Sequence, residues 1–245
     1  MSETAQAGTA GKTALVTGAS RGIGLETARR FIESVDDITT VVIAARESDA
    51  FAEAREQLGA LAEARGKKVV ARAIDVGDIP ALREAIAGIY AEVGNVDILI
   101  NNAGYTNPVP IHQVEFADFE RTMTVNLYAP FTLIQELLHQ GNTFDLIVNI
   151  ASTAGITGRS GWLTYSASKA AVINMSQVLR EELAIYGTRV VCLSPGRTAT
   201  ALRRVLAPTE DPSTIMQPEH VAQVIEAFAS PVGRYIDSEN IVVRL

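Results

Sequence analysis

Short apolar runs rich in β-branched residues recur along the chain, and a longer helical pattern follows nearly every one of them. The runs are almost continuously hydrophobic instead of alternating with polar residues, which is typical of parallel strands covered on both faces. They span residues 13–17, 39–44, 68–74, 98–101, 145–150, 189–193 and 240–243. Helical patterns lie near 22–34, 48–66, 79–93, 115–140, 164–186 and 217–229.

This strand-helix-strand recurrence predicts an α/β fold, because parallel strands need crossover connections and those connections are right-handed. We expect a doubly wound, seven-stranded parallel sheet with helices on both faces, a three-layer α/β/α sandwich of the Rossmann type. The 245 residues suit one domain. Residues 11–245 are predicted to form it, with the active site at the carboxyl ends of the strands.

Composition excludes several classes of partner. The formal net charge is −7 with no block of like charges, which argues against binding to nucleic acid or to an anionic membrane surface. No apolar stretch reaches the roughly 18 residues that a membrane span requires. Residues 1–10 are small and polar and lack the apolar segment of a signal peptide. We therefore expect a flexible N-terminal tail on a cytoplasmic protein.

A glycine-rich turn follows the first predicted strand and opens the first helix, with the sequence Thr17-Gly18-Ala19-Ser20-Arg21-Gly22-Ile23-Gly24. Gly18 permits a tight turn, Gly22 lets a pyrophosphate approach the backbone, and Gly24 permits close helix-strand contact. The helix N-terminus then offers unpaired N–H groups and a favourable dipole to phosphates. The turn, including Ser20, Arg21 and Ile23, is predicted to bind a dinucleotide.

The spacing Gly-x-x-x-Gly-x-Gly resembles that of the short-chain dehydrogenase/reductase family, and the resemblance continues to the last strand. The motifs occur in the family's order: Thr17–Gly24, Asp75-Val76, Asn101-Asn102-Ala103-Gly104, Asn126, Ser152, Tyr165-x-x-x-Lys169 and Pro195-Gly196-x-x-x-Thr200. The chain is most similar to the compact branch that includes the 3-oxoacyl-carrier-protein reductases. The resemblance implies an enzyme that interconverts a small-molecule carbonyl and an alcohol by hydride and proton transfer.

Four residues are predicted to be catalytic. Tyr165 and Lys169 are four positions apart in a helical segment, so their side chains lie on one face. The ammonium group favours the phenolate and shifts the tyrosine toward working pH. Ser152 follows a strand and would hold the substrate oxygen in the same crevice. The resemblance implies that Lys169 also binds the nicotinamide ribose and that Asn126 orders a water connecting this lysine to solvent.

The end of the second strand indicates the cofactor. An acidic residue there would bind the adenosine ribose and repel a 2′-phosphate, but this chain carries Arg46. Arg46 and Arg21 can make bidentate, charge-assisted contacts with a phosphate, so we expect NADP(H) to be preferred over NAD(H). The resemblance assigns further cofactor contacts near the adenine, along the groove floor and around the nicotinamide amide: Asp75, Val76, Asn102, Ala103, Gly104, Pro195, Gly196 and Thr198.

Residues 200–216 are predicted to form a lid over the substrate, and Pro208 and Pro212 argue against a long helix there. Arg203 and Arg204 are interpreted as solvated loop arginines, with contact to an anionic substrate as the alternative. The opposite wall is assigned to Thr106, Asn107, Trp162 and Leu163. These residues give a mixed pocket that identifies no particular substrate.

The resemblance implies self-association as a dimer through helices 115–140 and 164–186, with a tetramer left open. The histidines, His112, His139 and His220, are isolated in sequence, so no metal site is predicted. One alternative function is a non-catalytic, dinucleotide-sensing regulator with the same fold, although such proteins typically lose the tyrosine or lysine. Another is an epimerase or dehydratase of the longer sugar-nucleotide branch, whose glycine spacing differs.

Overall fold

The computed structural model describes residues 11–236 and 239–245, so the tail predicted at 1–10 lies outside the described residues. These residues contain a seven-stranded sheet in the order β3-β2-β1-β4-β5-β6-β7, and every neighbouring pair is parallel. The strands are β1 (Lys12–Thr17), β2 (Ile38–Ala45), β3 (Lys68–Ala73), β4 (Ile98–Asn101), β5 (Leu146–Ile150), β6 (Arg189–Pro195) and β7 (Ile241–Val243).

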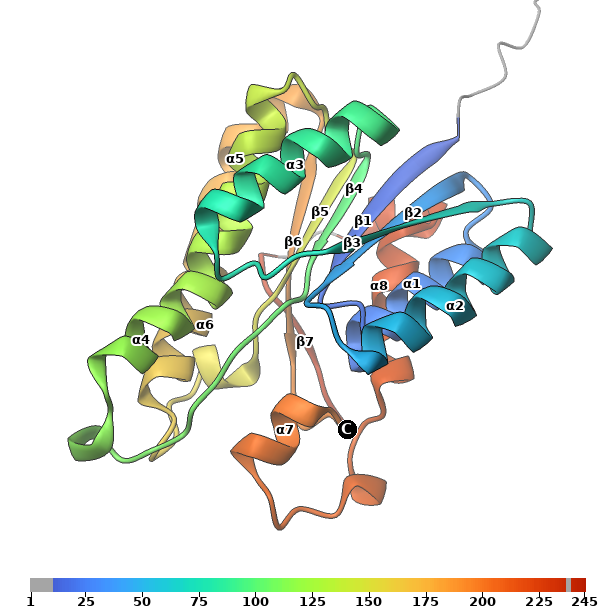
Figure 1. The fold of residues 1–245 in the computed structure, drawn as a ribbon. Coiled ribbons are helices and arrows are strands. Elements are labelled where there is room, and N and C mark those ends of the chain that lie inside the picture. Colours follow the sequence, from blue (N-terminus) through green and yellow to red (C-terminus); the bar gives the residue numbers. More distant parts are fainter. Residues whose placement is uncertain (1–10, 237–238) are drawn as a thin grey trace, which may run out of the picture.

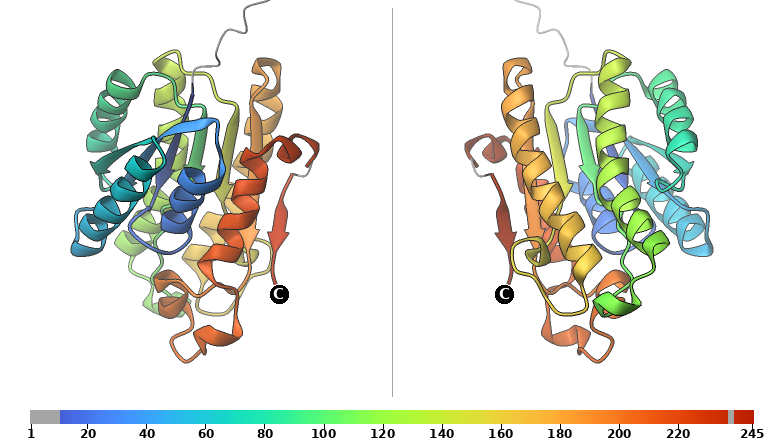
Figure 2. Two further views of the ribbon diagram at one scale, coloured as in Figure 1. Left: turned by 90° about the vertical axis from the view of Figure 1, so that its right-hand side faces the viewer. Right: turned by 90° about the vertical axis from the view of Figure 1, so that its left-hand side faces the viewer.

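Helices cover both faces of the sheet, as Figures 1 and 2 show. One layer holds α1 (Gly22–Ser34), α2 (Asp49–Ala64) and α8 (Pro218–Ala229). The other holds α3 (Ile79–Val93), α4 (Phe116–Met123), α5 (Ala129–His139) and α6 (Leu163–Leu183). A short helix, α7 (Ala201–Leu206), lies beyond the carboxyl ends of the strands. The predicted doubly wound, three-layer fold is confirmed.

Side-chain alternation explains why the strands are apolar throughout. In β1, Ala14 and Val16 belong to the core under α1, α2 and α8, whereas Leu15 belongs to the core under α3 and α5. Successive residues of a strand point to opposite faces. Because both faces are covered by helices, both sets of positions must be hydrophobic, and the three side chains are completely buried.

The helix predicted over 115–140 is divided in the structure. A π-helical turn, Thr124–Tyr128, separates α4 from α5, and the backbone N–H of Ala129 donates to the carbonyl oxygen of Thr124. Pro130 follows immediately and lacks the N–H that an α-helix would direct to the carbonyl of Asn126. The proline therefore accounts for the local change of hydrogen-bond pattern.

The strand order reverses beside β1, where β2 and β4 lie on its two sides and the following helices cover opposite faces of the sheet. Such a switch point opens a crevice at the carboxyl ends of the strands. The active site predicted at the carboxyl ends of the strands therefore coincides with the crevice that this strand order creates. Within the described parts of the chain, none of the helices is both long enough and apolar enough to span a membrane.

Candidate active site

A cleft of about 660 Å³ lies at this switch point. Its walls come from the turn after β1, the end of β2, the segments after β3 to β6, and the first turns of α6. Most residues predicted from the sequence line it: Gly18, Ser20, Arg21, Gly22, Ile23, Arg46, Asp75, Val76, Asn102, Ala103, Gly104, Ser152, Tyr165, Lys169, Pro195, Gly196 and Thr198. Gly24 and Asn126 are not among the residues that line the cleft.

The glycine turn is shaped by close backbone contacts. Gly18 has a φ of +68°, and a Cβ there would lie 2.8 Å from Nδ2 of Asn102. That amide donates to the carbonyl oxygens of Thr17 (2.9 Å) and Gly18 (3.3 Å) and so holds the turn against the end of β4. A Cβ on Gly24 would lie only 2.5 Å from the Gly18 oxygen. Gly24 therefore permits the helix to approach the turn from outside the cleft.

The N-terminus of α1 faces the cleft without a competing side chain. Gly22 is the first residue of the helix, Arg21 makes no side-chain capping bond, and the first turn contains no acidic residue. The first N–H groups of a helix have no intrahelical acceptor, and the helix dipole favours an anion beside them. These residues therefore fit a phosphate group.

Two exposed arginines lie at the same end of the cleft. Arg21 belongs to the glycine turn and Arg46 follows β2. Ser48, two residues after Arg46, is the N-cap of α2, and its hydroxyl accepts a hydrogen bond from Phe51 N. Asp75 is held by its own loop, because Oδ1 accepts a hydrogen bond of 2.9 Å from Gly77 N.

Tyr165, Lys169 and Ser152 lie close together at the other end of the cleft. Tyr165 is 6% exposed and Lys169 is 4% exposed. The lysine Nζ lies 5.9 Å from the centre of the tyrosine ring and donates to the carbonyl oxygen of Ile150 at 2.7 Å. Oγ of Ser152 accepts from Ala154 N at 3.1 Å, so its hydroxyl hydrogen can be donated to an oxygen in the cleft.

Burial dominates the titration of this group. It raises the pKa of Tyr165 above its ordinary value, against smaller lowering effects of the Ser152 hydroxyl and the Arg203 charge. Burial also lowers the pKa of Lys169 to about 8. The sequence suggested that the lysine would lower the pKa of the tyrosine. In the structure the opposing cation is Arg203, and burial outweighs it.

Asn126 lies in the π-helical turn and is 1% exposed. Its Oδ1 accepts from Tyr105 N at 2.8 Å, and its Nδ2 donates to Tyr105 O (3.0 Å) and to Oγ of Ser168 (2.9 Å). The side chain therefore fastens the loop after β4 to α6. It supports the cleft from behind instead of facing into it.

The predicted lid contains the short helix α7, which the sequence analysis did not anticipate. Thr200 caps it, since its hydroxyl accepts from Arg203 N at 3.1 Å. The two ends of the lid meet, because Ala199 N donates to Met216 O (2.8 Å) and Met216 N donates to Arg197 O (3.1 Å). The lid is thus a loop closed at its base.

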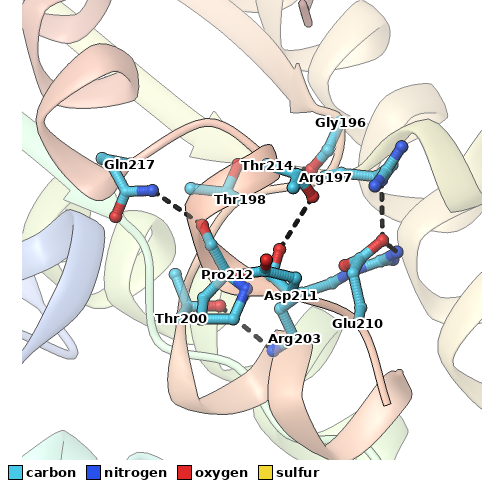
Figure 3. A network of polar contacts seen from close by, with 10 residues as sticks. All are labelled: Gly196, Arg197, Thr198, Thr200, Arg203, Glu210, Asp211, Pro212, Thr214 and Gln217. Atoms are coloured by element: carbon cyan, nitrogen blue, oxygen red, sulfur yellow. Dashed lines mark hydrogen bonds and ion pairs between the residues drawn. The ribbon is translucent and has the colours of Figure 1, made fainter. Parts of the chain in front are cut away.

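Figure 3 shows the polar network inside the lid. Glu210 accepts from Nε of Arg203 at 2.5 Å, from Nη2 of Arg203 at 2.7 Å and from Nε of Arg197 at 2.7 Å. These hydrogen bonds lower the pKa of Glu210 to about 2, and those from Arg203 have the largest effect. A carboxylate with two guanidinium partners stays ionised at neutral pH and fixes the lid arginines.

Aromatic rings hold further arginines in the cleft, and sequence reasoning missed most of them. The guanidinium carbons of Arg159 and Arg203 each lie 5.5 Å from the Trp162 ring centre. Arg121 lies 4.8 Å from that of Tyr105. All five residues line the cleft. Trp162 was predicted as a wall residue, but cation-aromatic pairs between loops have no fixed sequence spacing.

An open helix N-terminus and a glycine turn share one crevice with Ser152 and the buried pair Tyr165 and Lys169. This combination defines a dinucleotide-dependent oxidoreductase as the class of protein. Comparison with known proteins agrees. A family model described as short chain dehydrogenase matches residues 12–211. The chain belongs to this family of dehydrogenases and reductases that act on CH–OH and C=O groups, as the motifs predicted.

The chain is similar over almost its whole length to characterised relatives. It is 32% identical to the 3-oxoacyl-[acyl-carrier-protein] reductase FabG of Thermotoga maritima, covering 94% of this chain and 95% of that protein. A blue fluorescent protein from a metagenomic library, solved with NADPH, is 30% identical with a TM-score of 0.84, over 95% of this chain and 96% of the other. A short-chain dehydrogenase from Burkholderia cenocepacia, solved with NADP, is 28% identical with a TM-score of 0.82, over 95% and 96%.

Proposed function

We propose that the protein is an NADP(H)-dependent carbonyl reductase that also oxidises the corresponding alcohols. The observation that carries this proposal is a single cleft with the uncapped N-terminus of α1 at one end and Tyr165, Ser152 and Lys169 at the other. The glycines of the turn leave space that a Cβ would fill. The residues present therefore fit a dinucleotide along the cleft.

A bound nicotinamide supplies the hydride for reduction and accepts it for oxidation. Tyr165 donates its phenolic proton to the carbonyl oxygen as that oxygen gains charge. The phenol is protonated at neutral pH, because burial raises its pKa above an ordinary value that is already 10.0. Ser152 donates its hydroxyl hydrogen to the same oxygen. The Arg203 charge favours the phenolate left after proton transfer, and Lys169 places a second cationic group 5.9 Å from the centre of the tyrosine ring.

Replacement of Tyr165 by Phe tests the mechanism because it removes one hydroxyl and keeps the ring. We expect turnover to be lost while NADP(H) still binds, as followed by nicotinamide absorbance with a panel of aldehydes, ketones and alcohols. Retained turnover would exclude Tyr165 as the acid. If the wild-type protein bound NADPH and turned over nothing in the panel, the non-catalytic dinucleotide sensor would become the better description.

The preference for NADP(H) is part of the proposal and rests on Arg21 and Arg46. Both line the cleft and are exposed, and neither forms an ion pair with any residue in the described parts of the chain. The two relatives solved with NADPH or NADP support the same cofactor. Replacing Arg46 by Asp should raise KM for NADPH selectively. An equal loss with NADPH and NADH would contradict this role.

Self-association through α4, α5 and α6 is also proposed. The neighbouring helices α4 and α6 expose apolar side chains, and so does α5: Phe116, Phe131, Leu163 and Val178 are 70%, 47%, 47% and 49% exposed. Exposed apolar side chains on neighbouring helices favour an interface with a second copy of the chain, in line with the family resemblance. Sedimentation at micromolar concentration should therefore give a dimer or a tetramer, and a monomer alone would refute the proposal.

A further inference from the structure

We propose that the substrate end of the cleft selects a carbonyl compound that carries an anionic group, a carboxylate or a phosphate, and that Arg203 and Arg159 bind it. This proposal deepens the function given above and rests on it. It identifies the class of substrate that the Tyr165 site receives, which the family relationship leaves open.

The distribution of charge along the cleft supports this. The protein carries a formal net charge of −7, yet arginines outnumber acids among the residues that line the cleft. The two lining acids, Glu47 and Asp75, follow β2 and β3 at the end assigned to adenosine. The walls at the other end contain four arginines: Arg121, Arg159, Arg197 and Arg203. A cationic wall in an acidic protein raises the local concentration of anions.

Glu210 orients Arg203 without cancelling the charge of the wall. Its single carboxylate serves the guanidinium groups of both Arg203 and Arg197, as Figure 3 shows. Nε and Nη2 of Arg203 are used, and Nη1 has no hydrogen-bond partner within residues 11–236 and 239–245. The guanidinium is therefore held in place with donor capacity left for a ligand. Glu210 is a positioning residue.

Trp162 places the guanidinium group of Arg203 near Tyr165. Arg203 and Arg159 both lie over its ring, and Trp162 directly precedes α6, which carries Tyr165 in its first turn. Arg203 is also close enough to Tyr165 to favour its phenolate form. An anionic group bound by these arginines would thus lie close to the carbonyl that Tyr165 protonates. Planar guanidinium groups match carboxylate and phosphate oxygens.

The first test compares a charged and an uncharged substrate built on the same ring, 4-carboxybenzaldehyde and its methyl ester, at saturating NADPH. The wild-type kcat/KM should favour the acid by about tenfold or more, as expected for a charge-assisted hydrogen bond. Arg203→Gln and Arg159→Gln should raise KM for the acid by about tenfold and leave KM for the ester nearly unchanged. Arg204→Gln is the matched control, because Arg204 neighbours Arg203 on α7, is exposed and does not line the cleft.

The second test is independent of turnover. Trp162 is the only tryptophan, so its fluorescence reports directly on this wall. In the presence of NADP⁺, benzoate should change the Trp162 emission saturably. Benzamide, which carries no charge, should bind at least about tenfold more weakly than benzoate. Arg203→Gln should remove that difference, and added salt should reduce it. Equal affinity for benzoate and benzamide in the wild type, or equal kcat/KM for acid and ester, overturns the proposal. Failure to reduce any carbonyl with benzoate binding intact would refute only the proposed function.

Discussion

Gly155 provides a sharp test of how closely the catalytic helix must be placed. It ends a 3₁₀ turn, Thr153–Gly155, that begins directly after Ser152. A Cβ at this position would lie 2.6 Å from the carbonyl carbon of Lys169 and 2.8 Å from its oxygen. Both are backbone atoms of α6, so no side-chain rotation can relieve the contact. Gly155→Ala must therefore move the turn and α6 apart.

The displacement follows from the distances. Ordinary van der Waals contact begins at 3.4 Å, so the gap of 2.6 Å has to open by about 0.8 Å. That movement separates Ser152 from the helix that carries Lys169. A misplacement of this size costs about 100-fold in rate, and overpacking of a well-packed region costs about 1–3 kcal/mol of stability.

The assay is kcat at saturating NADPH and carbonyl, together with urea unfolding. Gly158→Ala is the matched control, because Gly158 lies in the same segment and a Cβ there meets nothing within 4 Å. We expect Gly155→Ala to lose about two orders of magnitude in kcat, whereas Gly158→Ala should behave like the wild type. If the two variants have the same kcat, the close approach of the turn to α6 does not control catalysis and the argument is wrong.

Three further predictions concern buried or paired groups. Because burial lowers the pKa of Lys169 from 10.5 to about 8, the unfolded chain binds more protons between these pH values. Lys169→Met should therefore be more stable than wild type at pH 7 by at most ~3 kcal/mol, with the difference shrinking toward pH 10.5 in urea titrations; a constant difference would contradict the shift. Asn126→Ala leaves the backbone groups of Tyr105 unpaired and should cost about 2–3 kcal/mol of unfolding free energy, so a cost below about 0.5 kcal/mol would show that the fastening is dispensable. Glu210→Gln should lower the free energy of unfolding by about 1 kcal/mol or less, after allowance for solvent screening. Because the pKa of Glu210 is lowered from 4.5 to about 2, the full loss should appear above pH 4.5 and disappear as the pH falls to 2. Unfolding of both proteins is compared across this pH range, and an equal difference at pH 2 and pH 6 would refute the prediction.

The sheet could be predicted because its strands leave a direct trace in the sequence. A strand such as β5, with every residue buried, has no polar alternation, and only a sheet covered on both faces requires that pattern. The crevice at the switch point then follows from the strand order, and residues that directly follow the strands are expected to line this crevice. For this reason the position of Ser152 after β5 predicts its place in the crevice, whereas the role of Asn102 after β4 depends on the family resemblance.

Other features could not be predicted because they depend on contacts between segments without fixed spacing. The pairing of Glu210 with Arg197 and Arg203 exists only after the lid has folded back on itself. The helix α7 is too short for its pattern to stand out from a loop. The division between α4 and α5, by contrast, is indicated in the sequence by Pro130. This proline lacks a backbone N–H and so interrupts the hydrogen bonds of an otherwise continuous helical pattern.

The closed base of the lid has a consequence for how such a protein changes over evolution. Because Ala199 and Met216 join the two ends of this segment, residues between them can be lengthened, shortened or exchanged while β6 and α8 keep their places. Loop closure penalises added length only weakly. New substrate ranges are therefore accessible through replacement of one surface segment, with the hydride-transfer chemistry inherited intact from the unchanged sheet beneath it.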